Sequence, residues 1–174
     1  MDDITLHIAT LDDANAVSAL FERSYSKLLV GDYAPETLKR AMPFLSHANP
    51  DLLASGTYYL AKNIAGDVVG AGGWTAMRPG SVDKDVQTGL AHVRHFAVDP
   101  DHARKGIGAM LFNRCLVDAR KRENVRRFEC YSTLSARRFY ETCGFRVIGN
   151  FDAPFAPDFT FPSLHMLRDQ IAES

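Results

Sequence analysis

The sequence predicts one domain of the α/β class, in an α+β arrangement, spanning residues 1–174. The length is near the usual size of a single domain, and with 46% hydrophobic residues the chain can bury a substantial core. Hydrophobic patterns of period two and of period 3.6 both recur, so strands and helices are mixed. No internal repeat, linker or low-complexity tract divides the sequence.

The N-terminal part predicts one strand and two helices. Residues 4–9 alternate as a strand, and residues 11–29 carry apolar side chains at helical spacing. A second helix starts at Pro35, because proline is favoured in the first helical turn. It is expected to end before Asn49-Pro50, since the residue before a proline is biased away from helix.

A hairpin and a polar loop are expected next. Residues 57–62 and 68–76 have strand character and flank Ala65-Gly66-Asp67, which is a turn signal. Residues 78–89 are polar and glycine-containing, which predicts a loop.

The second half predicts four more strands around a long helix. The helix runs from Gly106 to about Lys121, with Ile107 and Leu111 on its core face. The four strands are expected at residues 91–98, 126–131, 145–150 and 163–167.

The residues from His92 to Ala109 form a strand, a short loop and a glycine-rich helix start. The first turn of a helix has unpaired N–H groups and partial positive charge, so it binds anions such as phosphate. Gly106 and Gly108 lack a Cβ, which lets an anion approach the backbone. The glycine and lysine order does not fit a Walker loop, and Leu111 replaces the third glycine of a dinucleotide fingerprint. A diphosphate cradle is therefore predicted, with an ordinary helix entry as the alternative.

A second motif covers residues 132–145 and predicts a short helix. Ser and Thr precede it as N-cap residues, and Gly144 follows it as a C-cap. Ala136, Phe139 and Tyr140 have the spacing of one inward face.

These two motifs together resemble the Gcn5-related N-acetyltransferase (GNAT) family. Its acetyl-CoA motif, Gln/Arg-x-x-Gly-x-Gly/Ala, matches residues 103–108, with Ala103 in place of the leading residue. Its Ala-x-x-Phe-Tyr-x-x-x-Gly-Phe motif matches residues 136–145. The resemblance extends from about residue 4 to 168. It implies a mixed, mostly antiparallel twisted sheet of six to seven strands, about four flanking helices, and a V-shaped splay at the central strands.

The resemblance also implies acetyl-CoA as the co-substrate. The backbone of Phe96, Ala97 and Val98 would lie along the pantetheine arm, and an N–H of that strand would stabilise the oxyanion. The remaining cofactor-binding candidates are Arg104, Lys105, Gly106, Ile107, Gly108, Ala109, Ser135 and Arg137.

Two residues are the catalytic candidates. Tyr140 matches the tyrosine that protonates the departing sulfur in many family members, and a phenol with a pKa near about 10 carries its proton at neutral pH. His92 lies near the position where the family often has a glutamate base, with His95, Glu129 or a water chain as alternatives.

The acceptor is expected to be a primary amine of a small molecule or of an exposed protein group. Tyr33, Trp74 and Phe155 are the substrate-binding candidates, and the aromatic segment 151–162 suits either an amine pocket or a homodimer contact. A non-catalytic acyl-CoA-binding sensor or interaction module is the alternative function. Tyr140 favours the enzyme, because a binding module needs no positioned acid.

Composition excludes other classes of partner. A net charge of −1 gives no case for nucleic acid or acidic membranes. No secretory leader or membrane-spanning run is recognised, so a soluble, cytoplasmic protein is expected. Three cysteines suggest reduced core thiols, and no ligand cluster implies a metal.

Overall fold

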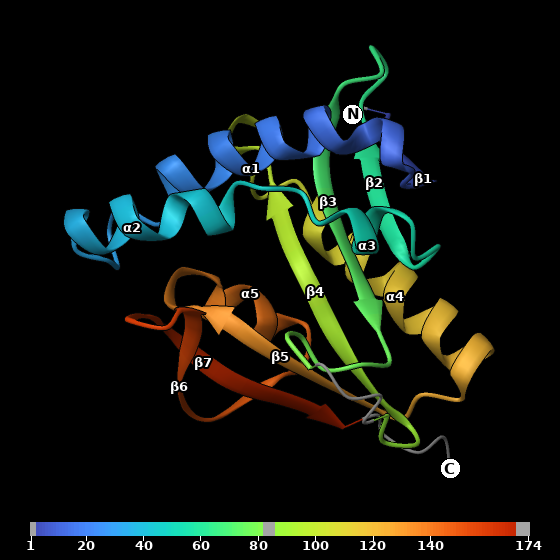
Figure 1. Cartoon of the computed structure of the whole chain (residues 1–174). Coiled ribbons are helices and arrows are strands. Elements are labelled where there is room, and N and C mark those ends of the chain that lie inside the picture. Colours follow the sequence, from blue (N-terminus) through green and yellow to red (C-terminus); the bar gives the residue numbers. More distant parts are fainter. Residues whose placement is uncertain (1–2, 82–85, 170–174) are drawn as a thin grey trace.

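The computed structural model describes residues 3–81 and 86–169, and their strands form one seven-stranded sheet in the order β1-β2-β3-β4-β5-β7-β6 (Figure 1). The strands are Thr5–Ile8 (β1), Tyr58–Lys62 (β2), Val68–Thr75 (β3), Leu90–Val98 (β4), Arg127–Thr133 (β5), Arg146–Ala156 (β6) and Phe159–Asp169 (β7). In the described part of the chain, β4 and β5 are parallel and every other neighbouring pair is antiparallel. The predicted mixed, mostly antiparallel sheet is confirmed.

Helices cover both faces of this sheet. They are Ala14–Leu28 (α1), Pro35–Leu45 (α2), Pro50–Leu53 (α3), Ile107–Glu123 (α4) and Arg137–Thr142 (α5). α1 packs on β3 and β4 from one side, and α4 packs on β2, β3 and β4 from the other (Figure 1). The four expected helices are present. The one-turn helix α3 is an addition, because four residues are too few to show a helical period.

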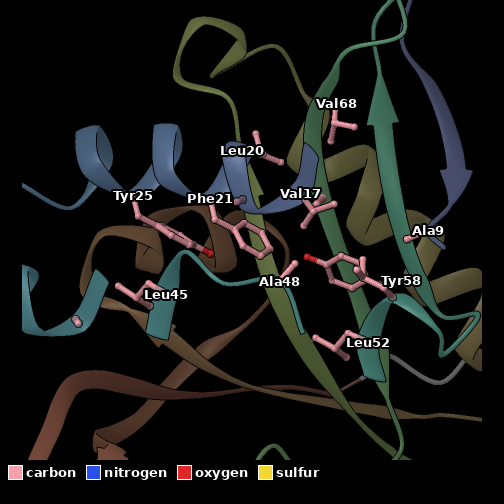
Figure 2. Packing of buried hydrophobic residues seen from close by; sticks show 14 of the residues in the cluster. Ala9, Val17, Leu20, Phe21, Tyr25, Leu45, Ala48, Leu52, Tyr58 and Val68 are labelled. Atoms are coloured by element: carbon pink, nitrogen blue, oxygen red, sulfur yellow. The ribbon is translucent and has the colours of Figure 1, made fainter. Parts of the chain in front are cut away.

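The core on the α1 face contains the apolar stripe of that helix. Val17, Leu20 and Phe21 have the i, i+3, i+4 spacing and are almost completely buried. Figure 2 shows Phe21 and Tyr25 of α1 near Tyr58 of β2. Burying each large side chain contributes about 1.5–3 kcal/mol, so this stripe fixes α1 on the sheet.

β6 and β7 form a longer hairpin than expected. The predicted strands ended at residue 150 and began at 163, whereas β6 continues to Ala156 and β7 starts at Phe159. Pro154 is tolerated because β6 is an edge strand and its register shifts there. Pro162 is tolerated because the pairing of β7 with β5 stops at Ser163.

The central strands diverge after a short parallel contact. β4 and β5 pair only through Leu90, Ala91 and His92, opposite residues 127–129. Beyond His92, β4 stays with β3 and β5 stays with β7, so the two strands separate (Figure 1). This is the predicted splay.

A β-bulge lies in the part of β4 that pairs with β3 but not with β5. Ala71 pairs with Ala97 but Gly73 pairs with Arg94, so two residues of β4 oppose one of β3. His95 has φ 45°, in the left-handed region. Simple alternation would place His92, Arg94 and Phe96 on one face; the bulge instead places His95 against α1 and Phe96 against the α4 core.

No helix in residues 3–81 and 86–169 is long and apolar enough to cross a membrane. The same residues hold no group of three or more His, Cys, Asp or Glu side chains arranged for a metal ion. All three cysteines are free thiols, as expected. The predicted loop 78–89 is described except for residues 82–85, which lie outside the described residues.

Candidate functional site

A cavity of about 560 Å³ lies where β4 and β5 diverge, and we call it the inter-strand cavity. Its wall combines β4, the start of α4, β5, α5 and the inner side of α1. Ten of the predicted site residues line it: Phe96, Ala97, Val98, Arg104, Gly106, Ile107, Gly108, Ala109, Ser135 and Tyr140. The fold thus brings together the two sequence motifs.

The start of α4 forms one end of this cavity. Gly106 is the N-cap residue with φ 80°, and its carbonyl accepts the first helical hydrogen bond, from Met110 N (2.9 Å). The N–H groups of residues 107–109 have no partner within the helix. A Cβ built on Gly106 meets nothing within 4 Å, so its surroundings are open. This end can hold an anion.

Gly108 serves packing. A Cβ at this position would lie 2.8 Å from the Phe139 ring. Its missing side chain therefore lets α4 approach α5, and its role in opening the backbone to an anion stays a prediction.

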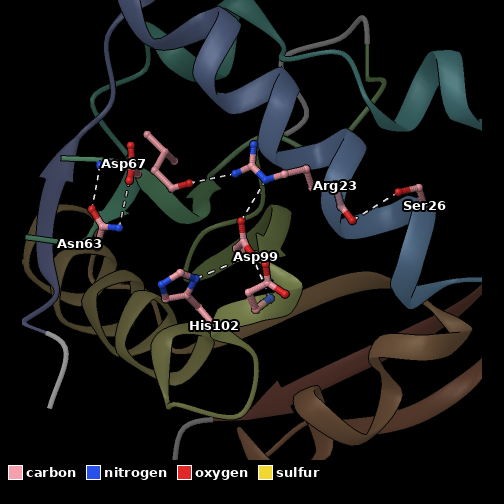
Figure 3. A network of polar contacts seen from close by, with 8 residues as sticks. Arg23, Ser26, Asn63, Asp67, Asp99 and His102 are labelled. Carbon is pink, nitrogen blue, oxygen red and sulfur yellow. Dashed lines mark hydrogen bonds and ion pairs between the residues drawn. The ribbon is translucent and has the colours of Figure 1, made fainter. Parts of the chain in front are cut away.

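A polar network holds the loop that leads into α4 (Figure 3). Asp99 follows β4 and accepts hydrogen bonds from Asp101 N and from Arg23 Nε, both at 2.9 Å. Arg23 also donates to the carbonyl of Val68 on β3 (3.3 Å), and His102 Nδ1 lies 3.7 Å from Asp99 Oδ1. α1, β3 and the loop before the helix start are thereby tied together.

Tyr140 stands at the inner wall of the cavity. It is 5% exposed, and its hydroxyl has no hydrogen-bond partner among the described residues. Burial raises its pKa well above the ordinary value, and nearby Cys130 adds to this effect. Phe96 and Phe145 contact its ring edge-on. The phenol is therefore a protonated group with an unused O–H.

Two tyrosines support the bulge in β4. Tyr25 on α1 donates to the carbonyl of Phe96 (2.9 Å), and Tyr58 on β2 donates to that of His95 (2.6 Å). Sequence reasoning missed both residues, because nothing in the local pattern pairs them with β4. They fix the strand segment that lines the cavity.

His95 lies in the cavity wall but is held neutral. Its ring stacks on Phe21, with centroids 3.8 Å apart, and its Nε2 is 2.9 Å from the carbonyl of Leu45. Because a carbonyl only accepts, Nε2 carries the hydrogen. Burial lowers the pKa of His95 to about 4.

A second group of polar residues lies where β4 and β5 still pair, and we call it the Glu129 cluster. Tyr131 donates to Glu129 Oε1 (2.9 Å), and His165 Nε2 lies 3.3 Å from Oε2. His92 Nδ1 and Arg78 Nη2 lie 3.7 and 3.8 Å from Oε1. Sequence reasoning named His92 and Glu129 separately; it missed the convergence, because β5 and β7 bring Tyr131 and His165 from distant segments.

The electrostatic environment of the Glu129 cluster sets the protonation states of Glu129 and His92. Burial alone would raise the pKa of Glu129, but the hydrogen bond from Tyr131 and the nearby imidazoles of His165 and His92 lower it below the usual value. Burial lowers the pKa of His92, with Glu129 opposing this and Arg78 adding to it. At neutral pH the carboxylate is ionised and His92 is neutral.

His92 does not line the inter-strand cavity. It lines a second cavity of about 340 Å³, which we call the polar cavity, together with Arg78, Ser81, Val86, Gln87 and Leu90. Tyr131 connects the two regions, since it lines the inter-strand cavity and bonds to Glu129.

Five other predicted residues lie outside the lining of the inter-strand cavity. Trp74 is 3% exposed in the α4 core and donates to the Tyr59 hydroxyl (3.3 Å), so the structure places this predicted acceptor contact in the core. Arg137 pairs with Glu141 (2.9 Å). Lys105 is not among the lining residues.

Tyr33 and Phe155 belong to an aromatic cluster beside α2. The Tyr33 hydroxyl donates to Pro162 O (2.7 Å) and accepts from Leu134 N (2.8 Å). Both rings stack on Phe161. These contacts anchor the α1–α2 connection to β7, and neither ring lines the inter-strand cavity or the polar cavity.

Comparisons with known proteins identify the family of the chain. A family model described as acetyltransferase (GNAT) domain matches residues 29–153. No curated protein sequence matches the chain significantly. The fold is similar to that of the PaiA N-acetyltransferase from Thermoplasma acidophilum in complex with coenzyme A, with a TM-score of 0.67 and 13% identity over 96% of this chain and 99% of that chain.

Two further structures are similar at the same level. The ribosomal-protein-S18-alanine N-acetyltransferase from Escherichia coli has a TM-score of 0.61 and 16% identity over 99% of this chain and 97% of that chain. An acetyltransferase of the GNAT family from Staphylococcus aureus Mu50 has a TM-score of 0.62 and 16% identity over 97% of this chain and all of that chain. Since the family model covers more than half of the sequence, the chain belongs to the GNAT acetyltransferase family.

Proposed function

We propose that this protein transfers an acetyl group from acetyl-CoA to a primary amine by direct attack in a ternary complex. The observation that carries the proposal is the inter-strand cavity, which joins an anion-binding helix start to an unpartnered, protonated phenol. A diphosphate and a thioester are the two chemical features of acetyl-CoA that these two ends suit.

The helix start would hold the diphosphate. The N–H groups of residues 107–109 and the open space at Gly106 provide the backbone contacts, and Arg104 adds positive charge at the cavity wall. Ser135 lines the same wall with a buried Oγ that has no partner among the described residues, so it is available to the cofactor. Lys105 and Arg137 remain proposed as outer contacts.

The pantetheine arm would follow the separated part of β4. Strand edges carry N–H and C=O groups that pair with an extended chain, and among the described residues β4 has no strand partner on the β5 side beyond His92. An N–H of residues 96–98 would stabilise the negative charge that develops on the thioester oxygen.

Tyr140 would act as the general acid. The amine nitrogen forms a bond to the acetyl carbon, the C–S bond breaks, and the phenol proton passes to the departing sulfur. The phenolate then regains a proton from solvent. A raised pKa suits this role because the group stays protonated throughout the neutral range.

His92 would accept the proton that the amine loses. Its Nδ1 faces the ionised Glu129, which favours the tautomer with hydrogen on Nδ1 and leaves Nε2 as the proton acceptor. Glu129 is the positioning residue in this arrangement. His95 is less suited, because its Nε2 hydrogen is committed to Leu45 and its pKa is near 4.

The test is the release of free thiol from acetyl-CoA with a panel of amines, together with calorimetric binding of acetyl-CoA. Amine-dependent thiol release supports the enzyme. Tight acetyl-CoA binding with no release for any amine would instead support the non-catalytic sensor.

A further inference from the structure

Among the described residues, the polar cavity and the adjoining part of β4 carry more positive than negative charge. Arg94 lies two residues beyond His92 on the same face of β4, before the bulge, and it is half-buried. Its Nη1 donates to Thr75 Oγ1 (3.0 Å), and no carboxylate pairs with it in residues 3–81 and 86–169. Arg78 pairs loosely with Glu129, and the charges of Arg78 and Arg94 both act on His92.

An unpaired, half-buried guanidinium is costly unless a ligand compensates it. Removing a charge from water without a partner is unfavourable, and burial does lower the pKa of Arg94. The charge also bears on its surroundings, since it disfavours the protonated forms of both His92 and His95. A cationic group without a compensating negative charge would be repelled here.

The polar cavity offers space and hydrogen-bond donors for an anion. Its volume of about 340 Å³ is at the lower end of the range for small-molecule sites. Arg78 lines it with a side chain that is 57% exposed and only loosely paired to Glu129, at 3.8 Å. Gln87 adds an amide on the same wall, and His92 lies at the inner end.

We propose that the acceptor is a small primary amine that also carries an anionic group, a carboxylate or a phosphate, bound by Arg78 in the polar cavity. Arg94 supplies the further positive charge, and the amine of the same molecule lies toward His92. A guanidinium suits either anion because its planar fork donates two parallel hydrogen bonds. This inference rests on the proposed acetyl transfer.

The experiment uses matched pairs of small amines. The ω-amino acids of two to four carbons are compared with their primary amides, which keep the amine and the size but lose the charge, and 2-aminoethyl phosphate provides the phosphate arm. Rates are compared per concentration of unprotonated amine, and binding of each compound to the coenzyme A-loaded protein is measured by calorimetry.

We expect at least about a tenfold higher kcat/KM for the anionic member of the preferred pair, mostly through KM. Arg78→Gln and Arg94→Gln should each reduce that preference to about threefold or less, because each lowers the rate with the anionic compound more than the rate with its amide. Arg146→Gln is the matched control, since Arg146 is an exposed arginine that pairs with a carboxylate, Asp169, on β7. It should leave the preference intact.

The failures of the two proposals are distinguishable. Equal use of acids and amides, or a preference that survives both Arg78→Gln and Arg94→Gln, overturns the anionic acceptor but not acetyl transfer. If no amine is acetylated, the proposal of acetyl transfer to these amines fails. The calorimetric data then test only the proposed anion-binding site. Arg78-dependent binding of the anionic compounds then supports it, whereas absent or unchanged binding overturns it. A preference for the phosphate or the carboxylate arm identifies the anion.

Discussion

The two regions at the central splay are built from different parts of the chain. The helix-start end of the inter-strand cavity consists mostly of backbone groups from one continuous segment, 104–109. The Glu129 cluster consists of side chains from β4, β5, β7 and the β3–β4 connection. The first region suits a ligand that many proteins share, because any residue supplies an N–H. The second suits a ligand particular to this chain.

The largest expected effect separates the chemistry from cofactor binding. Tyr140→Phe keeps the ring contacts with Phe96 and Phe145 but removes the only proton that the phenol offers to sulfur. Turnover should fall by roughly tenfold to a thousandfold, the range that general acids supply, while acetyl-CoA affinity barely changes. Steady-state rates and calorimetry measure the two effects. Wild-type turnover would make Tyr140 a packing residue only.

The two glycines of the helix start provide a contrast within one region. Gly106→Ala places a Cβ in open space beside the anion site and should weaken acetyl-CoA binding by about tenfold, with a strain cost of about 1–2 kcal/mol from the left-handed φ. Gly108→Ala drives a Cβ against Phe139 and should lower thermal stability more than Gly106→Ala does.

Calorimetry and thermal unfolding of the same two variants decide this contrast. Equal acetyl-CoA affinity for Gly106→Ala and the wild type would remove the diphosphate from this end of the cavity. A Gly108→Ala variant as stable as the wild type would show that α5 can move away from the added Cβ at little energetic cost.

The pH profile of turnover tests the Glu129 cluster. A base works when unprotonated, so activity should be lost as pH falls through the pKa of His92, which burial places below its ordinary value of about 6.5. Glu129→Gln removes a charge that raises this pKa and should move the acidic limb to lower pH. Arg78→Gln removes a charge that lowers it and should move the limb to higher pH. The profile of kcat at saturating acceptor is the measurement.

Opposite shifts in these two variants, together with loss of the acidic limb in His92→Gln, identify His92 rather than the neighbouring His165 as the titrating group. An acidic limb that is unchanged in a folded His92→Gln variant would assign the proton transfer to Glu129, His95 or water instead.

The smallest expected effect concerns the loop before α4. Asp99→Ala removes the cap on Asp101 N and the partner of Arg23, which should cost about 1–2 kcal/mol of unfolding free energy at neutral pH. Burial opposes the lowered pKa of Asp99, but its hydrogen bonds and Arg23 prevail. A depressed carboxyl pKa stabilises the fold above the unfolded value of about 3.9. The difference between wild type and variant should therefore shrink as pH falls below about 4, and a constant difference would exclude the charge as its source.

Local sequence predicted the elements of the fold because each element shows a regular pattern of residues. The seven strands and four main helices follow from periodicity, caps and turn residues such as Pro35 and Gly144. The order of the strands and the splay came from the family resemblance. The one-turn α3 and the full length of the β6–β7 hairpin were missed, since four residues show no period and prolines such as Pro154 argue against a strand.

The residues of the candidate site also fall into two groups, those that local sequence predicted and those that it did not. The helix start and Tyr140 were predicted because their residues lie within short motifs. The partners of Glu129 were not, because pairing across β5 and β7 decides which side chains meet. The burial of Trp74 was not predicted, since exposure of an aromatic residue on a strand depends on which helix covers that face, here α4.

The most direct test of this division of roles is a crystal structure of the protein with coenzyme A bound. We predict the diphosphate on the N–H groups of residues 107–109, the pantetheine arm between β4 and β5, and the sulfur within about 4 Å of the Tyr140 hydroxyl. The Glu129 cluster and the polar cavity should stay free of cofactor. A diphosphate bound elsewhere, or a cofactor that occupies the polar cavity, would contradict the account.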